Sequence, residues 1–262
     1  STTVSGTLSS VREMHLKYCD LDYKTCTLLN RIPLELLHLR ARIDQVSWGG
    51  LTENRNETRI KTMSVRLSDP YGETVKEEFG ERLSSEDIKG GFDTLRNHPS
   101  LKRLHIPRCC VKHEEPVPPE LANVLRADMA TKLTHVCLPC PEWTHLECLT
   151  DALAHHRTVT HVTFDEPFFR GSSETVIDAF VKLLKQNRRI VELRSMLGID
   201  VVKERWQVVD KQLDENRLYQ AQQAFIYDPK LLAETFWSLR GRRNVIFRFL
   251  QKHLARILLW NR

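Results

Sequence analysis

The sequence lacks long hydrophobic runs and is poor in glycine, and each shortage excludes a class of protein. Its apolar runs hold only a handful of residues, as at positions 257–260, whereas a membrane-spanning helix needs about 20. No membrane span is therefore predicted. With 10 glycines and 11 prolines in 262 residues, the chain is neither collagen-like nor a linker, and 41% hydrophobic content is typical of a globular protein with a full core.

The sequence also lacks a disulfide framework and a secretory signal. Its seven cysteines are an odd number, so at least one thiol cannot pair within the chain, and their spacing is not that of a stapled extracellular domain. The chain begins Ser1-Thr2-Thr3, without the charged and apolar segments of a signal peptide. Both observations favour a reducing compartment, cytoplasmic or nuclear.

One phrase recurs along the chain: an apolar residue followed by apolar residues three and five positions later. Two copies, which start at Val11 and Leu101, also carry a cysteine at the eighth position, Cys19 and Cys109. Further copies start at Leu34, Ile60, Leu133, Val159 and Ile190. The last has Ser195 in place of its third apolar residue. Seven starts between 23 and 41 residues apart predict seven similar units.

These phrases resemble the leucine-rich repeat, L-x-x-L-x-L-x-x-N/C-x-L, in which a short strand alternates core and solvent residues. Amphipathic helical patterns lie between them, as at Leu146, Leu149 and Leu153 and at residues 176–184. Long units of a strand and a helix resemble the ribonuclease-inhibitor-like branch. The resemblance implies an α/β fold, a curved solenoid of about seven strand-helix units with a parallel concave sheet.

Several helical patterns end in asparagine shortly before or after a repeat phrase, as at Asn97, Asn187 and Asn216. Asparagine tolerates the left-handed conformation of a helix C-cap, so we expect the helices to stop there. The long interval between the third and fourth phrases predicts helices over residues 74–83 and from about 85 to 96. Three prolines predict an extended connection over residues 113–119.

The repeat pattern ends after Asn216, and two helices are predicted over residues 230–239 and 243–259. The terminal unit of a solenoid needs its apolar edge covered. We therefore divide the chain into a leucine-rich-repeat domain, residues 1–226, and a basic C-terminal helical cap or tail, residues 227–262.

The repeat register predicts a surface, because the second, fourth and sixth positions after each start point away from the core. Histidines and basic residues gather there: His15, Lys17, His38, Arg40, Arg66, Arg103, His105, His135, His161 and Arg194. In this register His15 lies beside His38, and Ser64 beside His105. We predict that the concave face binds an acidic partner segment and that its histidines gain charge as the pH falls toward about 6. Alternatively, these residues simply fill solvated strand positions.

The C-terminal segment is strongly basic. Residues 229–262 carry eight Lys or Arg against one acid, a net +7 in a chain of +5. The basic surface comprises Arg242, Arg243, Arg248, Lys252 and Arg256. Apolar residues from Ile246 to Leu258 recur at helical spacing beside it. Two interpretations stay open: the apolar stripe caps the last repeat, or the basic helices contact a partner helix, an acidic membrane surface or nucleic acid such as RNA or DNA.

Motifs for metal binding and catalysis are scarce. Cys137, Cys140, His145 and Cys148 bring four possible zinc ligands together. Their spacing is not that of a zinc knuckle, and cysteine is common in cores, so no metal site is predicted. No phosphate-binding glycine loop, H-E-x-x-H helix or G-x-S-x-G elbow occurs. We therefore expect a non-enzymatic protein without a cofactor.

The resemblance implies a binding function, since this branch includes ubiquitin-ligase substrate receptors, innate sensors, actin-filament cappers and GTPase regulators. The expected function is an adaptor or scaffold subunit of a larger assembly that binds a protein partner, acidic in character, on the concave face. The alternative is a nucleic-acid-associated protein that binds RNA or DNA through its basic C-terminal helices.

Overall fold

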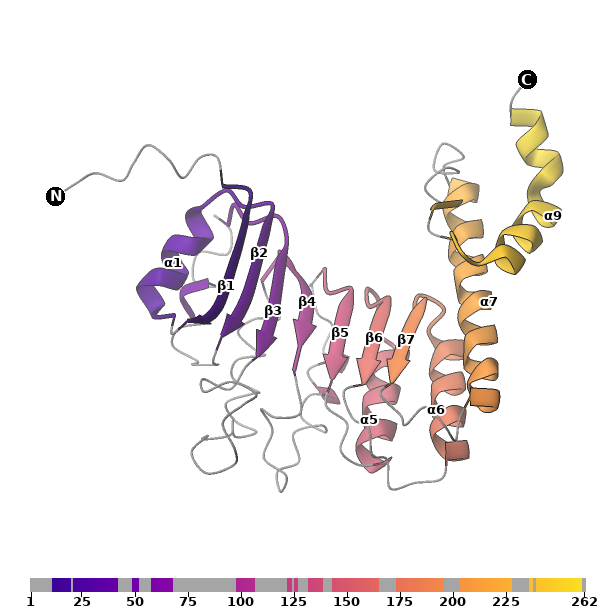
Figure 1. Ribbon diagram of the computed structural model, residues 1–262, viewed down its shortest axis with the longest axis horizontal. Coiled ribbons are helices and arrows are strands. Elements are labelled where there is room, and N and C mark those ends of the chain that lie inside the picture. Colours follow the sequence, from indigo (N-terminus) through magenta and orange to yellow (C-terminus); the bar gives the residue numbers. More distant parts are fainter. Residues whose placement is uncertain are drawn as a thin grey trace.

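Seven strands form one parallel sheet in the order of the sequence (Figure 1). The computed structural model describes residues 11–19, 21–41, 49–51, 58–67, 98–106, 122–123, 125–126, 132–138, 143–164, 173–195, 203–227, 236–237 and 239–260. The strands are β1 (Glu13–Cys19), β2 (Leu36–Ala41), β3 (Met63–Leu67), β4 (Leu101–His105), β5 (His135–Leu138), β6 (His161–Phe164) and β7 (Glu192–Ser195). Each overlaps one repeat phrase, which confirms seven strands in a parallel sheet.

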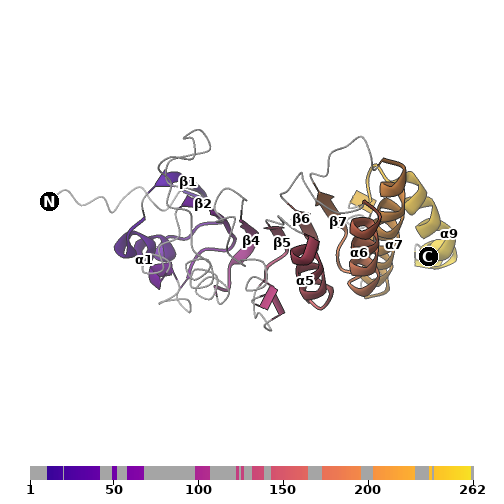
Figure 2. The ribbon, with the colours of Figure 1, turned by 90° about the horizontal axis from the view of Figure 1, so that it is seen from below.

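Helices alternate with the strands, and a final helix follows beyond the end of the sheet. They are α1 (Tyr23–Arg31), α5 (Trp143–Ala154), α6 (Ser173–Gln186), α7 (Lys203–Tyr227) and α9 (Arg243–Trp260). Figure 2 shows α1, α5 and α6 together on one side of the strands. Parallel neighbours need such crossover connections, because a tight hairpin cannot join them. The fold is therefore α/β, with the helical side covered and the other side carrying the outward strand residues.

Alternation along each strand builds the core. In β5 and β6 every second residue is buried, so that Val136, Leu138, Val162 and Phe164 face the helices while the residues between them are partly exposed. Helix residues complete the layer, and the Phe164 and Phe180 rings stack with centroids 5.3 Å apart. Burying each large apolar side chain contributes roughly 1.5–3 kcal/mol, which makes this layer the main source of stability.

The register between β3 and β4 differs from the sequence-based prediction. Ser64 pairs with Arg103 and not with His105, which pairs with Arg66 instead. The chain is offset by two positions, with an irregularity between Met63 and Ser64. A two-residue slip keeps every side chain on its own face, because the side-chain period of a strand is two. Apolar alternation therefore specified the face of β3 correctly but not its position along β4.

The C-cap prediction is wrong for Asn216, which lies inside the unbroken helix α7. Its side chain is buried, and its amide nitrogen Nδ2 donates to the carbonyl oxygens of Leu184, Asn187 and Ile190 at 3.0, 3.3 and 2.9 Å. These carbonyls lie in the last turn of helix α6 and just after it, where the helix itself offers no donors. Asn216 therefore satisfies the backbone of the preceding unit.

Equivalent side chains recur where helices give way to strands. Asn187 follows α6 as predicted, and its Nδ2 donates to the carbonyls of Leu153 and His156 at 2.7 and 2.9 Å. His156 holds the same place after α5, and its Nδ1 accepts from the backbone N–H of Val159 at 3.3 Å. We call the buried set the corner row: Asn30, His98, His156, Asn187 and Asn216. Asn97 lies outside the described residues, and the adjacent His98 is the corner residue.

The C-terminal helices form a second hydrophobic cluster. It consists of Leu218, Ala221, Phe225, Leu239, Val245 and Phe249. Gly241 adopts a φ of 80° just before α9, a conformation that glycine accepts without strain. Helix α9 confirms the predicted helix over 243–259. The helices predicted at 74–83 and 85–96, the connection at 113–119 and most of 230–239 lie outside the described residues, and the division into 1–226 and 227–262 stays a prediction.

Candidate functional site

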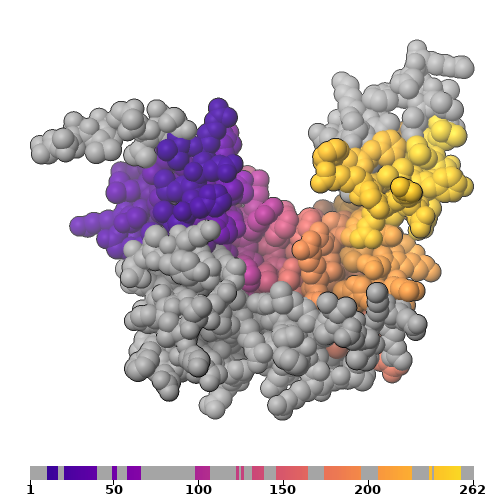
Figure 3. All heavy atoms as spheres, in the orientation of Figure 1, coloured from indigo at the N-terminus to yellow at the C-terminus, as the bar shows by residue number. Residues whose placement is uncertain are grey.

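Two rows of paired strand positions cross the whole sheet. The first, which we call the open-face row, pairs strand by strand as His15, His38, Ser64, Arg103, His135, His161 and Glu192. The second row runs parallel to it as Lys17, Arg40, Arg66, His105, Cys137, Thr163 and Arg194. All ten residues predicted for partner binding therefore lie on two adjacent rows. Figure 3 shows the molecule in space-filling form, with the strands from indigo to orange along the sheet.

At the β1 end, the open-face row contains a histidine pair. The rings of His15 and His38 have centroids 5.5 Å apart and are tilted, as expected from neighbouring strands. Nδ1 of His38 lies 3.0 Å from Oγ of Ser64 on β3. Side-chain contacts thus join β1 to β2 and β2 to β3. Lys17, Arg40 and Arg66 hold the corresponding positions of the second row.

At the β7 end, a second histidine pair is held more tightly. The His135 and His161 rings stack with centroids 4.0 Å apart and an interplanar angle of 11°. Each Nδ1 lies 2.8 Å from the hydroxyl of the preceding residue, Thr134 or Thr160. Because both Nδ1 atoms are engaged, Nε2 is the nitrogen of each ring that can meet a ligand.

Glu192 closes this end of the row. Its Oε1 accepts from Nε of Arg194 at 2.6 Å, and its Oε2 lies 3.7 Å from Nε2 of His161. The Glu192 side chain is 36% exposed and that of Arg194 is 73% exposed. The carboxylate is therefore shared between a close guanidinium and a more distant imidazole at the solvent boundary.

Burial keeps the tight histidine pair neutral. It lowers the pKa of His135 to about 4, with His161 and Arg103 acting in the same direction and Glu192 opposing them. Burial also lowers the pKa of His161, aided by Arg103, Arg194 and Arg217 and opposed by Glu192. The expectation that the histidines charge near pH 6 is thus wrong for His135 in the free protein.

Two residue types of this site were missed from the sequence, Thr134 with Thr160, and Glu192 as a contact of the histidines. A signal for the first was present. The dipeptide Thr-His occurs at 134–135 and again at 160–161, at equal positions in consecutive units. A repeated dipeptide in an outward strand position indicates that the hydroxyl and the imidazole act together.

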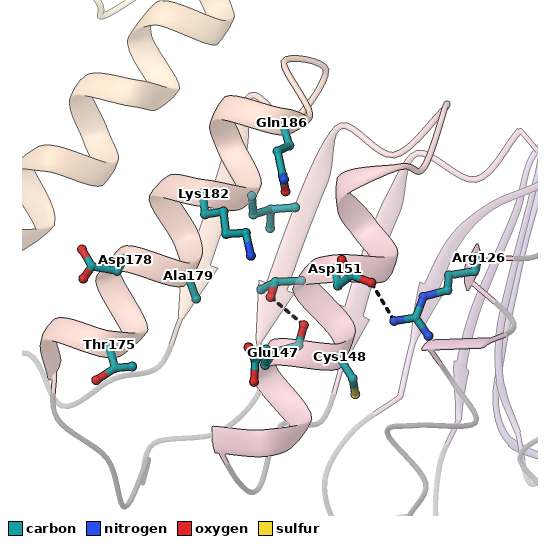
Figure 4. Close-up of a pocket in the computed structure, with 11 residues that line it drawn as sticks. Arg126, Glu147, Cys148, Asp151, Thr175, Asp178, Ala179, Lys182 and Gln186 are labelled. Carbon is teal, nitrogen blue, oxygen red and sulfur yellow. Dashed lines mark hydrogen bonds and ion pairs between the residues drawn. The ribbon is translucent and has the colours of Figure 1, made fainter.

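A groove lies on the helical side of the sheet. It has a volume of about 500 Å³ and lies between α5 and α6. Figure 4 shows Lys182 extending from α6 toward α5, and Arg126 bonded to Asp151 with Nη2 and Oδ2 2.8 Å apart. Burial raises the pKa of the Cys148 thiol, which disfavours the thiolate that nucleophilic or metal chemistry needs. One ion pair, Arg126 with Asp151, lies in the groove, and the Cys148 thiol is disfavoured as a nucleophile.

The candidate zinc ligands are separated by the sheet. Cys137 lies on the outward side of β5, whereas Cys148 lies on α5 and lines the groove on the helical side. Cys140 is outside the described residues, and the side chain of His145 is too. Among the residues that the structure describes, no three His, Cys, Asp or Glu side chains are arranged to hold a metal ion.

The basic C-terminal surface lies on helix α9 and directly before it, and α9 packs against α7. Val245 and Phe249 are buried, and the Phe249 ring meets Phe225 of α7 edge to face at 5.6 Å. On the outer side of α9, Phe247 and Leu254 are 61% and 52% exposed. The predicted residues Arg242, Arg243, Arg248 and Lys252 are exposed, and Arg256 lies on α9.

Two of these basic residues contact the helix beneath them. Nζ of Lys252 lies 3.1 Å from Oε1 of Gln222, and Nε of Arg242 lies 3.9 Å from Oδ1 of Asp214. Both contacts are made to α7 and hold α9 against it. None of the helices in the described part of the chain has the length and apolarity that crossing a bilayer requires.

Comparison with known proteins gives only distant structural likeness. No family model matches the sequence, and no curated protein matches it. A solved structure of leiomodin-1 actin-binding site 2 is similar, with 18% identity and a TM-score of 0.46, over 56% of this chain and 82% of that one. An uncharacterized protein from Parabacteroides distasonis ATCC 8503 matches with 13% identity and a TM-score of 0.27, over 76% and 78%. Likenesses this weak carry no conclusion about function.

Proposed function

We propose that the protein is a non-enzymatic interaction module that binds an acidic segment of a partner protein across the open face of its sheet. The observation that carries the proposal is the pair of in-register outward rows. They hold Lys17, Arg40, Arg66, Arg103 and Arg194 with one acid, Glu192. Such a module acts as an adaptor or scaffold subunit, and its cytoplasmic or nuclear location stays a prediction.

Charge on neighbouring strands supports this choice of partner. Arg40 and Arg66 are direct neighbours, as are Lys17 and Arg40. Like charges in such cross-strand pairs destabilise a free sheet by roughly 0.2–1 kcal/mol each. An acidic segment that lies across the strands relieves this repulsion and gains speed of association and specificity from the complementary charge.

The proposal extends to the architecture. We assign the chain to a leucine-rich-repeat solenoid of the ribonuclease-inhibitor-like type, with α9 as its cap and the open face as its concave side. Support comes from the corner row, in which Asn187 and Asn216 each bond the carbonyls of the preceding unit. Contacts limited to neighbouring units are the signature of a solenoid.

The test uses charge reversal on the described part of the face. Arg103→Glu with Arg194→Glu is expected to weaken binding of a fluorescein-labelled hexaglutamate peptide about tenfold or more, because two attractive contacts become repulsive. Fluorescence anisotropy at fixed ionic strength measures the affinity. Lys211→Glu is the matched control, since Lys211 is an exposed cation on α7. Equal affinity in the reversed and control variants would contradict the proposal.

A second candidate function rests on the outer side of α9. Exposed Phe247 and Leu254 lie on the same helix as Arg243, Arg248 and Lys252, and Arg240 covers the exposed Trp237 ring at 4.4 Å. Basic and aromatic groups together can hold single-stranded nucleic acid. If this surface binds RNA, Arg243→Glu with Arg248→Glu weakens binding of a labelled RNA and reduces its salt dependence. Binding that these changes leave intact would exclude it.

A further inference from the structure

The tight histidine pair is built to present two hydrogen-bond donors. The Nδ1 atoms of His135 and His161 are both engaged with threonine hydroxyls, and the two rings are parallel. Parallel rings held through the same atom point their Nε2 atoms in the same direction. The two Nε2 atoms therefore converge on one region in front of β5 and β6.

The threonine hydroxyls serve the rings in both charge states. When a ring is neutral, the hydroxyl can donate to Nδ1, which leaves the proton on Nε2. When the ring is charged, the hydroxyl accepts from Nδ1–H and turns its own proton to a carbonyl, that of Lys102 for Thr134 and that of Thr134 for Thr160, each 3.2 Å away. In the charged ring Nε2–H is a donor, as an anion-binding site requires, and a bound carboxylate stabilises this charged form.

Glu192 already presents a carboxylate to this region. It is bonded at 2.6 Å to Arg194, but its other oxygen lies 3.7 Å from Nε2 of His161, too far for a hydrogen bond. Arg103 pairs with His135 on the adjoining strand. Arg103, His135 and His161 are thus consecutive along the open-face row, and Glu192 ends that row without a hydrogen bond to the rings.

We propose that Arg103, His135, His161 and Arg194 form a subsite for one carboxylate of the acidic partner, and that Glu192 is an internal competitor which the partner's carboxylate displaces. This inference rests on the proposed function and names the place on the open face that recognises a carboxylate of the partner. The incoming carboxylate accepts from Nε2 of the histidines and takes over the guanidinium of Arg194. No covalent bond changes in this exchange.

Occupation of the subsite is coupled to proton uptake. The groups that face the two rings are Arg103 from β4, Glu192 and Arg194 from β7 and Arg217 from α7. Burial is the largest cause that lowers both histidine pKa values; Arg103 lowers both further, Arg194 and Arg217 lower that of His161, and Glu192 raises both. A ligand carboxylate closer than 3.7 Å stabilises the imidazolium more than Glu192 does. By linkage, affinity for an acidic peptide rises as the pH falls from 7.5 to 5.5.

The first experiment removes the competitor. Glu192→Gln keeps the shape of the side chain and removes its charge, so hexaglutamate is expected to bind about three- to tenfold more tightly at pH 7. Glu147→Gln is the control, because Glu147 is an exposed carboxylate on α5 at the helical side. Weaker or unchanged binding by the Glu192 variant overturns the inference.

The second experiment tests whether peptide binding is coupled to protonation of the two histidines. Anisotropy titrations between pH 5.5 and 7.5 are expected to show affinity rising toward low pH in the wild type, and a flat profile in His135→Gln with His161→Gln. Histidine NMR supplies an independent reading, in which added peptide raises the pKa of both rings. A pH slope that survives the double substitution, or histidine resonances indifferent to the peptide, overturns the subsite.

The two proposals fail differently. If Arg103→Glu with Arg194→Glu abolishes binding while the Glu192 and histidine variants behave as wild type, the open face is the interface and the subsite is wrong. If hexaglutamate binds neither the wild type nor any variant, both proposals are wrong. Thermal denaturation of each variant checks that a loss of binding does not come from unfolding.

Discussion

The corner row and the open-face row each contain a pair of histidines, and the two rows use the imidazole in opposite ways. In the corner row, His98 and His156 are 0% and 7% exposed, and Nδ1 accepts backbone N–H groups, from Ser100 and from Thr158 and Val159. In the open-face row, Nδ1 of His135 and His161 is tied to a threonine and Nε2 is left for a ligand. The corner rings complete the backbone, whereas the outward rings offer a donor.

The difference teaches that the group which contacts Nδ1 decides whether a histidine of this sheet completes the backbone hydrogen bonds or faces a ligand. A corner histidine stands where Asn187 stands one unit later, and the Oδ1 of that asparagine accepts the N–H of Arg189 in the same manner. Neutral acceptors of this kind are interchangeable in principle. The outward pair has a different partner and a different environment, and asparagine could not replace its Nε2–H donors.

The largest effect is expected from breaking the corner row at Asn216. Asn216→Leu keeps the volume but leaves the carbonyls of Leu184, Asn187 and Ile190 without their amide donor in a buried place. Loss of about 3–5 kcal/mol in the free energy of unfolding is expected, as for other buried unsatisfied groups. Urea denaturation measures it, with Lys211→Leu on the exposed side of α7 as control. A loss below about 1 kcal/mol would show that water replaces the amide.

A smaller loss of stability is expected on acidification, because the two histidines of the corner row are buried. Burial lowers the pKa of His98 to about 4 and also lowers that of His156, so both bind protons in the unfolded chain before they do in the folded one. Stability is therefore complete above about pH 6.5 and falls as the pH drops toward 4. His98 accounts for roughly 2–3 kcal/mol of this fall.

The matched variant for this prediction is His98→Asn, which can accept the Ser100 N–H as Asn187 accepts that of Arg189. Urea denaturation at pH 7 and at pH 4.5 is expected to show a smaller acid loss in the variant than in the wild type. Equal losses in both proteins would mean that other groups, the carboxylates above all, govern acid unfolding.

The smallest effect is expected on the open face. Arg103→Glu changes the free energy of unfolding by less than about 0.5 kcal/mol, because Arg103 is exposed and surface charges contribute little to stability. Denaturation at pH 7 checks this, alongside the binding measurement on the same variant. A loss comparable to that of Asn216→Leu would break the distinction between the two rows.

The sequence predicts the strands and their faces well, and for a physical reason. Apolar residues two positions apart, such as Leu104 and Ile106, are buried in the structure because a strand has a period of two. The same period conceals a two-residue slip, so the neighbour of Ser64 was predicted wrongly. The long interval before β4 supplied no other constraint on its position.

The candidate site is only partly readable from sequence. Repeat positions brought His135 beside His161, and the structure places them so. Their low pKa values depend on burial and on arginines of other strands and of α7, which are long-range effects. Asn216 was expected to end a helix because local preference favours that, and a tertiary need for an amide between three carbonyls prevails.

Helix α7 belongs to both hydrophobic clusters, with Leu213 in the first and Phe225 in the second. An α-helix turns about 100° per residue, so the number of residues between these positions sets the direction in which α9 leaves the sheet. Removing one residue would rotate Phe225 away from Phe249, whereas inserting seven would restore the direction to within about 20°. The length of α7 therefore preserves this direction only in steps of about seven residues, which is two turns of the helix.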